Sequence, residues 1–595
     1  MCGIIACRTH SPAAQYLLTG LRRLEYRGYD SVGIAVRTIS GDVVRMRTTH
    51  RIDALDRAVA DWDGKTFGGV GIGHTRWATH GQATEVNAHP HVDCAGRISL
   101  VHNGVIENAS ALRRELTRSG HLFATGVDSE VLCHLVEDQL AFAGDLLAAV
   151  KGAVVFLEGS WAIAVLEEST GRLVVAANRS PLIVAHTTVG DFAASDITAI
   201  ADWVDEFQVL EDGDVVELTG VNGWHDPDKT VPTPALARFV WHGTDSGLAG
   251  HADFMAKEID EQSERAARVL DEVGGRIANG ALWSDLGLQR FDRVHVIGCG
   301  TSLNAGHVIG NVVRRLGGLP VTSTVASETG ESVREPGTLL LAISQSGETA
   351  DVLNAIADGA AGGAPMLALV NNPHSTLARR ADAVVTCSAG PEIGVAATKT
   401  FTCQIVAGVA VMISALVSAG RLSRATAGTM VDDLRCLPDR LAAAGLVAGC
   451  IVPALADELV DASGFLFIAR GTGLPYAAEG ALKLKELSYR WAEHYPAGEL
   501  KHGPLALITR GTPVVVVDDG SPKLATNVSE VRARGGLVVS VGPLGSTVPV
   551  TGNPDAPWGP IESVLPLQIL ARSLALALGH DVDKPRNLAK SVTVE

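Results

Sequence analysis

Cysteine is sparse in this sequence, with nine residues among 595. The nine are odd in number and widely spaced, and no CxxC pair occurs. Neither a disulfide framework nor a zinc ribbon is therefore indicated. One group of possible ligands lies close together in the sequence, but its spacing matches no compact zinc pattern, so we expect no metal; the group is His80, His89, His91, Cys94 and His102.

Positive charge is also in short supply. The 49 lysines and arginines are outnumbered by 66 acidic residues, which gives a net charge of −17. Nucleic acids and acidic membranes select basic surfaces, so neither is an expected partner. A small phosphorylated substrate is not excluded, because a local group of hydrogen-bond donors can hold a phosphate.

Long hydrophobic runs are missing. The longest uncharged apolar run, Ile405 to Val417, is shorter than the ~20 residues that a membrane span needs. Arg8, His10 and Arg22 interrupt the apolar residues near the start, so no signal peptide is expected. With 46% hydrophobic residues the chain is predicted to be globular, to fold as several domains and to be cytoplasmic.

The first residues suggest a catalytic nucleophile. The chain begins Met1-Cys2-Gly3, and removal of Met1 would leave Cys2 with both a thiol and a free α-amine. An α-amine has a pKa of ~8, so it can serve as a base near neutral pH. Cys2 would then combine a nucleophile with its own base. The alternative is that a cysteine at this position has no function.

Residues 1 to about 220 are predicted to form antiparallel layers of short strands with a few helices. Gly, Asn and Ser separate the apolar segments, as is typical of such layers. The expected helices are Ala13–Leu24 and Ser129–Leu140, and the expected strands are 70–72, 98–101, 161–166, 173–176 and 182–185.

Three polar patches in this region contain side chains suited to amide chemistry. Arg76 could clamp a substrate carboxylate, or it could pair with a protein carboxylate. Asn103 and Gly104, where a strand is expected to run into a turn, could bind an oxyanion or form an ordinary hairpin turn. Asp128 could receive a substrate ammonium, or it could cap the helix that follows.

The motifs of this region resemble the class II glutamine amidotransferases. They are Cys2-Gly3-Ile4, Arg22 to Ser31, His74 to Gly81 and Asn87 to His91. The resemblance implies an N-terminal-nucleophile hydrolase fold, an αββα sandwich. It also implies Cys2 as nucleophile, Asn103 and Gly104 as the oxyanion hole, and a glutamine-binding set made up of Arg76, Trp77, Thr79, His80 and Asp128. Trp77 matches a tryptophan thought to gate the passage of ammonia.

The second half contains a diverged internal repeat. Residues 293–302 form an apolar strand ending in a Gly-rich turn, and residues 465–473 repeat this pattern. Alternating strands and helices predict two tandem, doubly wound α/β domains. We expect domains at 2–220, 251–445 and 446–580, a linker at 221–250 where the composition changes, and a tail at 581–595.

The loop Ser344-Gln345-Ser346-Gly347-Glu348-Thr349 lies between an apolar strand and a helix expected to begin near Asp351. Hydroxyl groups and backbone N–H groups at a helix N-terminus form an anion site, so we favour a bound phosphate. The alternative is a helix that is simply well capped.

Three further stretches carry titratable side chains. Lys483 and Glu486 are three residues apart and therefore on one face of an expected helix. They could form a surface salt bridge or a partly buried pair. His502 lies in an expected turn, and Lys590 lies in an apolar tail where a desolvated amine could form a Schiff base.

These motifs, with Cys299 to Ser302 and Glu392 to Ala396, resemble the glucosamine-6-phosphate synthase family. The resemblance implies a homodimeric aminotransferase that uses L-glutamine and fructose 6-phosphate and needs no cofactor. It implies that His502 opens the sugar ring, Lys590 forms an imine and Glu486 moves a proton. The implied sugar-phosphate set is Thr301, Ser302, Ser344, Gln345, Ser346, Thr349, Lys483 and Ala589. Trp77 and the tail are the expected couplers of the two reactions.

Two other functions would leave different marks in the sequence. A different class II amidotransferase would carry an acidic phosphoribosyl loop or a Ser-Gly-Gly pyrophosphate loop, and the sequence has neither. A sugar-phosphate-binding regulator with inactive sites would be expected to lack Cys2, Glu486 or Lys590, and all three are present.

Overall fold

A computed structural model of the chain describes residues 2–64, 66–78, 81–219, 224–225, 237–238, 247–331, 335–357, 363–553 and 555–592. The chain divides into two compact units: unit 1, residues Met1–Ser246 with Ser591–Glu595, and unit 2, residues Gly247–Lys590. Most of the predicted linker 221–250 lies outside the described residues.

Unit 1 contains, among the described residues, an eight-stranded and a six-stranded sheet, both antiparallel. The first sheet has the order β14 (Ala237–Arg238), β11 (Glu206–Val209), β9 (Ile183–Thr187), β10 (Gly190–Ala194), β1 (Gly3–Thr9), β4 (Phe67–Arg76), β2 (Ser31–Thr38) and β3 (Val43–Thr48). The second has the order β13 (Trp224–His225), β12 (Val215–Leu218), β8 (Leu173–Asn178), β7 (Gly159–Glu167), β6 (Ile98–Ile106) and β5 (His91–Val92).

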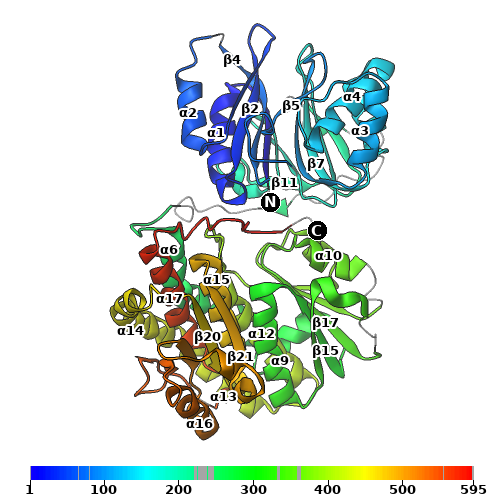
Figure 1. Cartoon of the computed structure of the whole chain (residues 1–595). Helices are drawn as coiled ribbons and strands as arrows, with labels where there is room; N and C mark the ends of the chain where they lie inside the picture. Colours follow the sequence, from blue (N-terminus) through cyan, green and yellow to red (C-terminus); the bar gives the residue numbers. More distant parts are fainter. Residues whose placement is uncertain are drawn as a thin grey trace. The chain divides into compact units, whose positions relative to one another are not determined.

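The alternation of side chains along β1 shows how the layers of unit 1 pack. Ile4 and Ala6 belong to a core shared by the two sheets, whereas Ile5 and Cys7 pack with helix α1. Helices α1 (Ala13–Leu24) and α2 (Ile52–Ala60) lie beside the first sheet; α3 (Ala109–Arg118), α4 (Ser129–Ala143) and α5 (Leu146–Val154) lie on the side of the second (Figure 1). The predicted αββα sandwich is confirmed.

Unit 2 contains, in its described residues, two five-stranded parallel sheets. The first is ordered β16 (Val321–Val325), β15 (Arg293–Gly298), β17 (Thr338–Ser344), β18 (Met366–Val370) and β19 (Ala383–Thr386). The second is ordered β21 (Trp491–Pro496), β20 (Gly464–Ala469), β22 (Pro513–Val517), β23 (Leu537–Gly542) and β24 (Val548–Pro549). Both sheets place their first strand between the second and third, which is a doubly wound topology. The predicted internal repeat is therefore confirmed.

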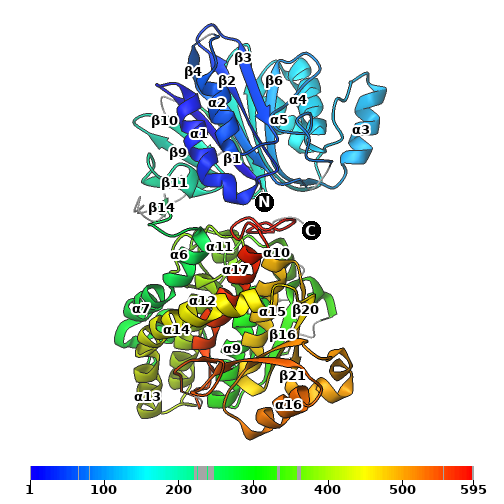
Figure 2. The ribbon, with the colours of Figure 1, turned by 60° about the vertical axis from the view of Figure 1, so that its left-hand side comes forward.

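The helices of unit 2 pack on both sheets and join them. One apolar core extends through both repeats, which explains why they form a single compact unit. The predicted boundary after residue 445 falls within α14, and α14 and α17 lie close together (Figure 2). The helices are α6 (Phe254–Asp260), α7 (Gln262–Val273), α8 (Ala281–Asp285), α9 (Gly300–Gly317), α10 (Ala350–Ala357), α11 (Thr376–Arg380), α12 (Lys399–Ser418), α13 (Arg424–Arg435), α14 (Leu437–Glu458), α15 (Leu474–Ser488), α16 (Pro522–Arg532) and α17 (Val564–Ala577).

Helix α12 is longer than the apolar run in the sequence suggests. It has 20 residues, so that by length and composition it could cross a membrane. Its most apolar window is 94% buried inside the unit, which makes α12 a core helix. The stretch Arg424–Glu458 meets the same length and composition criteria and is 28% buried.

Candidate active sites

Cys2 lies at the start of β1, beside the end of β4. The Trp77 N–H donates to the Cys2 Sγ over 3.2 Å, and Sγ lies 3.4 Å from the Trp77 carbonyl oxygen. The next residue, Gly3, has no room for a side chain, because a Cβ there would lie 2.6 Å from the Thr75 Oγ1 and 2.7 Å from the Leu24 Cβ. The thiol of Cys2 is thus held against the backbone of Trp77, at the end of β4.

Asn103 and Gly104 are not in a turn, contrary to the sequence prediction. Strand β6 continues through both to Ile106, paired with β7, so the pairing of the two sheet strands overrides the turn preference of Asn-Gly. Gly104 has φ +122°, and a side chain there would overlap the Ser160 carbonyl oxygen on β7. Glycine is therefore required at this position by both conformation and space.

The amide of Asn103 is oriented by a histidine. The His74 Nε2 lies 3.0 Å from the Asn103 Oδ1 and 2.9 Å from the His102 carbonyl oxygen. Both oxygens accept, so Nε2 carries the proton of the imidazole. The Asn103 Nδ2 then donates to the Cys2 carbonyl oxygen over 3.0 Å. An N–H donor of Asn103 therefore lies beside the nucleophile residue, where it binds the backbone carbonyl oxygen of Cys2.

Charges of both signs surround Cys2. Burial raises the pKa of its thiol, and the Trp77 N–H and the Arg76 charge oppose this effect, whereas Asp128 adds to it. Burial lowers the pKa of Arg76, and the charges of Cys2, Asp30 and Asp128 act against that shift. Cys2, Arg76 and Asp128 thus lie near enough to act on one another electrostatically. Trp77 is half-buried, and Thr79 and His80 lie outside the described residues.

Asp128 caps helix α4 and also joins it to β6. Its Oδ1 accepts from the Ser129 N–H and its Oδ2 from the Ile106 N–H, each over 3.0 Å. A carboxylate has about four lone-pair positions, so these bonds leave capacity for a substrate ammonium. The capping and binding interpretations are therefore compatible.

The predicted phosphate loop lies at the topological switch point of the first parallel sheet. Ligands of doubly wound sheets bind at the carboxyl ends of the strands where the order reverses, here between β15 and β17. The Ser344 Oγ lies 2.8 Å from the Thr349 Oγ1 and accepts from the Gly347 N–H over 3.0 Å. The Ser346 Oγ accepts from the Glu348 N–H over 3.1 Å, and α10 begins at Ala350 as expected. Gln345 is half-buried in the same loop.

A buried charge cluster connects the other strand of this switch point to α15. The Thr301 Oγ1 donates to Glu479 over 2.9 Å, and the Ser302 Oγ accepts from Gln404 over 3.1 Å. The Lys483 Nζ, whose side chain is 1% exposed, lies 2.7 Å from Glu486 and 3.6 Å from Glu479. Lys483 and Glu486 therefore form a partly buried pair rather than a surface salt bridge.

The opposing charges determine the ionisation of this cluster. Burial would lower the pKa of Lys483, but the carboxylates of Glu486, Glu479 and Glu392 raise it overall. Burial raises the pKa of Glu479. Lys483 therefore stays charged, and Glu479 ionises less readily than a free glutamate.

Lys590 is held in a second buried cluster in unit 2. Its Nζ donates to the Glu392 Oε2 over 2.5 Å and to the Gly394 carbonyl oxygen over 2.7 Å. The Lys590 charge overcomes the effect of burial and holds the pKa of Glu392 below its usual value. Burial and the neighbouring Glu392 raise the pKa of Glu258 to about 8. Lys590 is thus desolvated, as the Schiff-base hypothesis requires, but is also ion-paired.

The remaining predicted residues are less closely tied to this cluster. Ala589 is half-buried next to Lys590 in the chain. His502 ends the short helix η7 (Ala497–His502) and is exposed. Within the described part of the chain, no hydrogen bond or ion pair joins His502 to Glu486 or Lys590.

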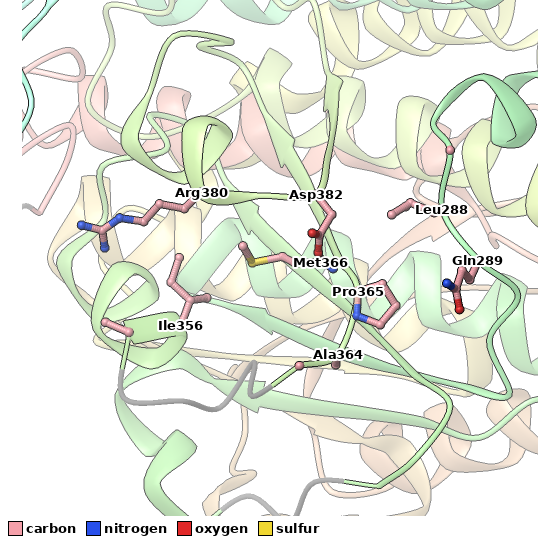
Figure 3. Close-up of a pocket in the computed structure, with 11 residues that line it drawn as sticks. Leu288, Gln289, Ile356, Ala364, Pro365, Met366, Arg380 and Asp382 are labelled. Carbon is pink, nitrogen blue, oxygen red and sulfur yellow. Dashed lines mark hydrogen bonds between the residues drawn. The ribbon is translucent and has the colours of Figure 1, made fainter. Parts of the chain in front are cut away.

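A cavity of about 690 Å³ lies elsewhere in unit 2 (Figure 3). Its lining includes Pro365, Met366 and Asp382, at the amino ends of β18 and β19, and Leu288, between α8 and β15. None of its lining residues is a predicted site residue. Because doubly wound sheets bind ligands at the opposite strand ends, we do not assign the substrate to this cavity.

Three partners of the predicted residues were missed from the sequence. Glu479 precedes Lys483 by four residues on an expected helix, a spacing that could have revealed it. His74 and Glu392 lie in the motifs that carry the family resemblance. Their contacts join segments far apart in the chain, so no sequence spacing indicates these contacts.

Comparison with known families agrees with this architecture. The model of the glutamine amidotransferase domain matches residues 74–202, and that of the SIS domain matches residues 287–414 and 458–557. A solved C-terminal domain of glucosamine-fructose-6-phosphate aminotransferase from Francisella tularensis aligns with a TM-score of 0.52 and 30% identity, over 57% of this chain and 100% of that chain. The fold and sites define a glutamine amidotransferase joined to paired SIS domains.

Full-length relatives identify the family. A glutamine–fructose-6-phosphate aminotransferase (isomerizing) of Thermus thermophilus is 42% identical over 616 residues, covering 100% of both chains. The protein of the same name from Pseudomonas putida is 40% identical over 620 residues, again covering 100% of both. The chain belongs to the glutamine–fructose-6-phosphate aminotransferase (isomerizing) family, which confirms the resemblance found in its motifs.

Proposed function

We propose that this enzyme transfers the amide nitrogen of L-glutamine to fructose 6-phosphate and isomerises the product, giving glucosamine 6-phosphate and glutamate. This is the first step of hexosamine biosynthesis. The observation that carries the proposal is full-length membership of the family with Cys2, Glu486 and Lys590 all present. Neither a metal nor an organic cofactor takes part in the proposed steps.

The glutaminase reaction begins once Met1 is removed. The α-amine of Cys2 accepts the thiol proton, and the sulfur attacks the side-chain amide carbon of glutamine. The Asn103 Nδ2 and the Gly104 N–H stabilise the tetrahedral oxyanion. Arg76 and Asp128 hold the α-carboxylate and α-ammonium of glutamine, with Trp77, Thr79 and His80 completing the pocket. Collapse releases ammonia and leaves a thioester, which water hydrolyses to glutamate.

The isomerase reaction uses the switch point of unit 2. The phosphate of the sugar binds Ser344, Gln345, Ser346 and Thr349, where α10 begins. The remaining sugar contacts come from Thr301, Ser302, Lys483 and Ala589.

Ring opening and amination follow. His502 assists ring opening, and the Lys590 amine forms an imine with the carbonyl carbon, which ammonia then displaces. The amine must first lose a proton, and Glu392, at 2.5 Å, is the base nearest to it. Glu486 then moves a proton between C1 and C2, because an imine acidifies the adjacent C–H bond.

Imine trapping tests the isomerase assignment. Borohydride added with fructose 6-phosphate should attach the reduced sugar phosphate to the peptide that contains Lys590. Lys590→Arg should abolish the adduct and amino-sugar synthesis, whereas Lys584→Arg, in the same tail, should retain both. An unchanged adduct in the Lys590→Arg variant would refute the role of Lys590.

We also infer a cytoplasmic homodimer. Helix α14 exposes Ala443, Leu446, Cys450 and Ala454 at helical spacing, and Leu446 is 75% exposed. A second copy of the chain would cover this face. Leu446→Glu should lower the mass measured by light scattering from that of a dimer to that of a monomer, and a monomeric wild type would refute the inference.

A further inference from the structure

Four side chains with metal-binding atoms meet in unit 1, outside the group around Cys2. Cys94 follows β5, His121 follows α3, and His134 and Glu137 lie one turn apart on α4. Their ligand atoms all lie within 4.8 Å of one another. The two histidines and the glutamate are buried, and Cys94 is exposed. The cluster therefore joins three segments at the edge of the second sheet.

Four of the six separations between the ligand atoms are close to those of a coordination tetrahedron. The Cys94 Sγ lies 3.5 Å from the Nδ1 of both His121 and His134. The Glu137 Oε2 lies 3.0 Å from the first Nδ1 and 3.1 Å from the second. Tetrahedral zinc, with bonds of ~2.3 Å to sulfur and ~2.0 Å to nitrogen or oxygen, requires sulfur–nitrogen separations of roughly 3.5 Å and nitrogen–oxygen separations of roughly 3.3 Å.

The outer nitrogen of His121 is hydrogen-bonded to a carboxylate, whereas that of His134 is not. The His121 Nε2 lies 2.8 Å from the Asp138 Oδ1, so Nε2 carries the proton and Nδ1 keeps a lone pair for a metal. The His134 Nε2 lies 3.9 Å from the Glu130 Oε1, too far for a hydrogen bond, and has no hydrogen-bond partner in the described part of the chain. Glu130 is itself fixed by the backbone N–H groups of Ala124 and Thr125. A carboxylate behind a ligating histidine is the usual arrangement at zinc sites.

Hydrogen bonds among the four side chains explain their arrangement less well than a bound metal ion does. The Glu137 Oε2 would have to accept from both imidazoles and from the Cys94 N–H, which lies 3.2 Å away. If His121 donates from Nε2 to Asp138, its Nδ1 can accept from the Cys94 thiol at 3.5 Å, but it then lies 3.0 Å from a second acceptor, the Glu137 Oε2, unless His121 is a buried imidazolium, at a cost in desolvation. A cation at the centre of the four atoms removes both difficulties.

We propose that Cys94, His121, His134 and Glu137 bind one Zn²⁺ ion. One thiolate, two imidazoles and one carboxylate form a ligand set suited to zinc, and four protein ligands indicate a structural rather than a catalytic ion. The ion would tie residues 121–128 to α4 and to the β5–β6 connection. Since this segment ends at Asp128, the ion would also stabilise the position of a proposed glutamine-binding residue.

Metal analysis of the purified full-length protein tests the proposal independently of its enzymatic activity. Wild type, after dialysis, should retain one zinc per chain by mass spectrometry of the elements. Cys94→Ser and His134→Asn should lower zinc affinity at least tenfold, on the order expected for disturbing a metal site. Cys436→Ser, which replaces another exposed cysteine in unit 2, is the matched control and should retain zinc.

Cobalt provides a readout in the wild type, which does not depend on how well any variant folds. Co²⁺ added to apo wild type should give the absorption of thiolate-bound, four-coordinate cobalt, which should persist in Cys436→Ser and disappear in Cys94→Ser. Zinc should also raise the Tm of wild type but not that of Cys94→Ser. Absence of bound zinc and of the cobalt absorption in wild type, or equal zinc retention in Cys94→Ser, would overturn the proposal.

Discussion

Replacing His74 should slow the glutaminase although His74 has no proposed contact with glutamine. Its Nε2–H donates to the Asn103 Oδ1 over 3.0 Å, which leaves the Asn103 Nδ2 directed at Cys2. Burial lowers the pKa of His74 to about 3, so the imidazole is neutral throughout the usual assay range and its donor is present at every assay pH. The perturbation we choose is His74→Met, which is apolar and cannot donate.

The magnitude follows from the bond that is removed. A buried oxygen left without its donor costs ~1–3 kcal/mol, and this is the preference that keeps the amide in its productive orientation. If that preference is lost, kcat should fall by roughly 5- to 150-fold. The upper limit is the effect of removing an oxyanion-hole donor altogether, on the order of 10²–10³.

The assay is glutamine hydrolysis at saturating fructose 6-phosphate, with kcat and KM measured separately. His74→Met should lower kcat and leave the KM for glutamine within about twofold, because Arg76 and Asp128 are unchanged. His74→Gln, which can place an N–H near the same position, should recover most of kcat. Synthesis with added ammonia should proceed at the wild-type rate in both variants, because it needs only unit 2.

Either of two results would refute this reasoning. In one, His74→Met keeps the wild-type kcat. In the other, His74→Gln is as slow as His74→Met although both variants melt at the same temperature, which would mean that the donor at Nε2 does not matter.

Three further predictions concern single side chains. Gly104→Ala, which would overlap the Ser160 carbonyl oxygen, should abolish glutamine hydrolysis but leave ammonia-dependent synthesis, and both are measured by product assay. Lys483→Met should destabilise unit 2 by ~3–5 kcal/mol in denaturant unfolding because it removes the cation from the buried Glu479 and the partly buried Glu486, whereas Lys485→Met, at an exposed pair, should cost less than about 1 kcal/mol. The pKa of Glu258 is about 8 when folded and ~4.3 when unfolded, so its contribution to stability is complete below about pH 4 and is lost as pH rises to 8. Glu258→Gln should flatten this pH dependence, by on the order of 5 kcal/mol, in melting experiments across that range.

Each of these predictions has a clear contrary outcome. Hydrolysis by Gly104→Ala at the wild-type rate would show that the strand adapts to the side chain. Equal unfolding free energies of Lys483→Met and Lys485→Met would show that the buried cluster is not stabilised by its cation. The same pH slope in Glu258→Gln as in wild type would place the titrating group elsewhere.

Much of the fold was predictable from local sequence patterns. Helix α1 occupies Ala13–Leu24 as expected, because its apolar residues recur at helical spacing and are buried. The apolar strands β15 and β20 and the Gly-rich turns after them were recognisable as a repeat, since parallel strands buried on both faces are continuous apolar segments.

The geometry of the sites was decided by tertiary structure. Asn103-Gly104 favours a turn locally, but pairing with β7 keeps it in a strand. The contacts of His74 with Asn103 and of Lys590 with Glu392 join residues that no local pattern relates.

The proposed zinc site shows the same limit. Cys94 was weighed as a ligand together with its sequence neighbours, whereas the folded chain brings it to His121, His134 and Glu137. The sequence by itself determined the elements, the repeat and the chemical types available, because these depend on residue types and their spacing. Which side chains meet depended on sheet register and helix packing, because these bring together residues far apart in the chain.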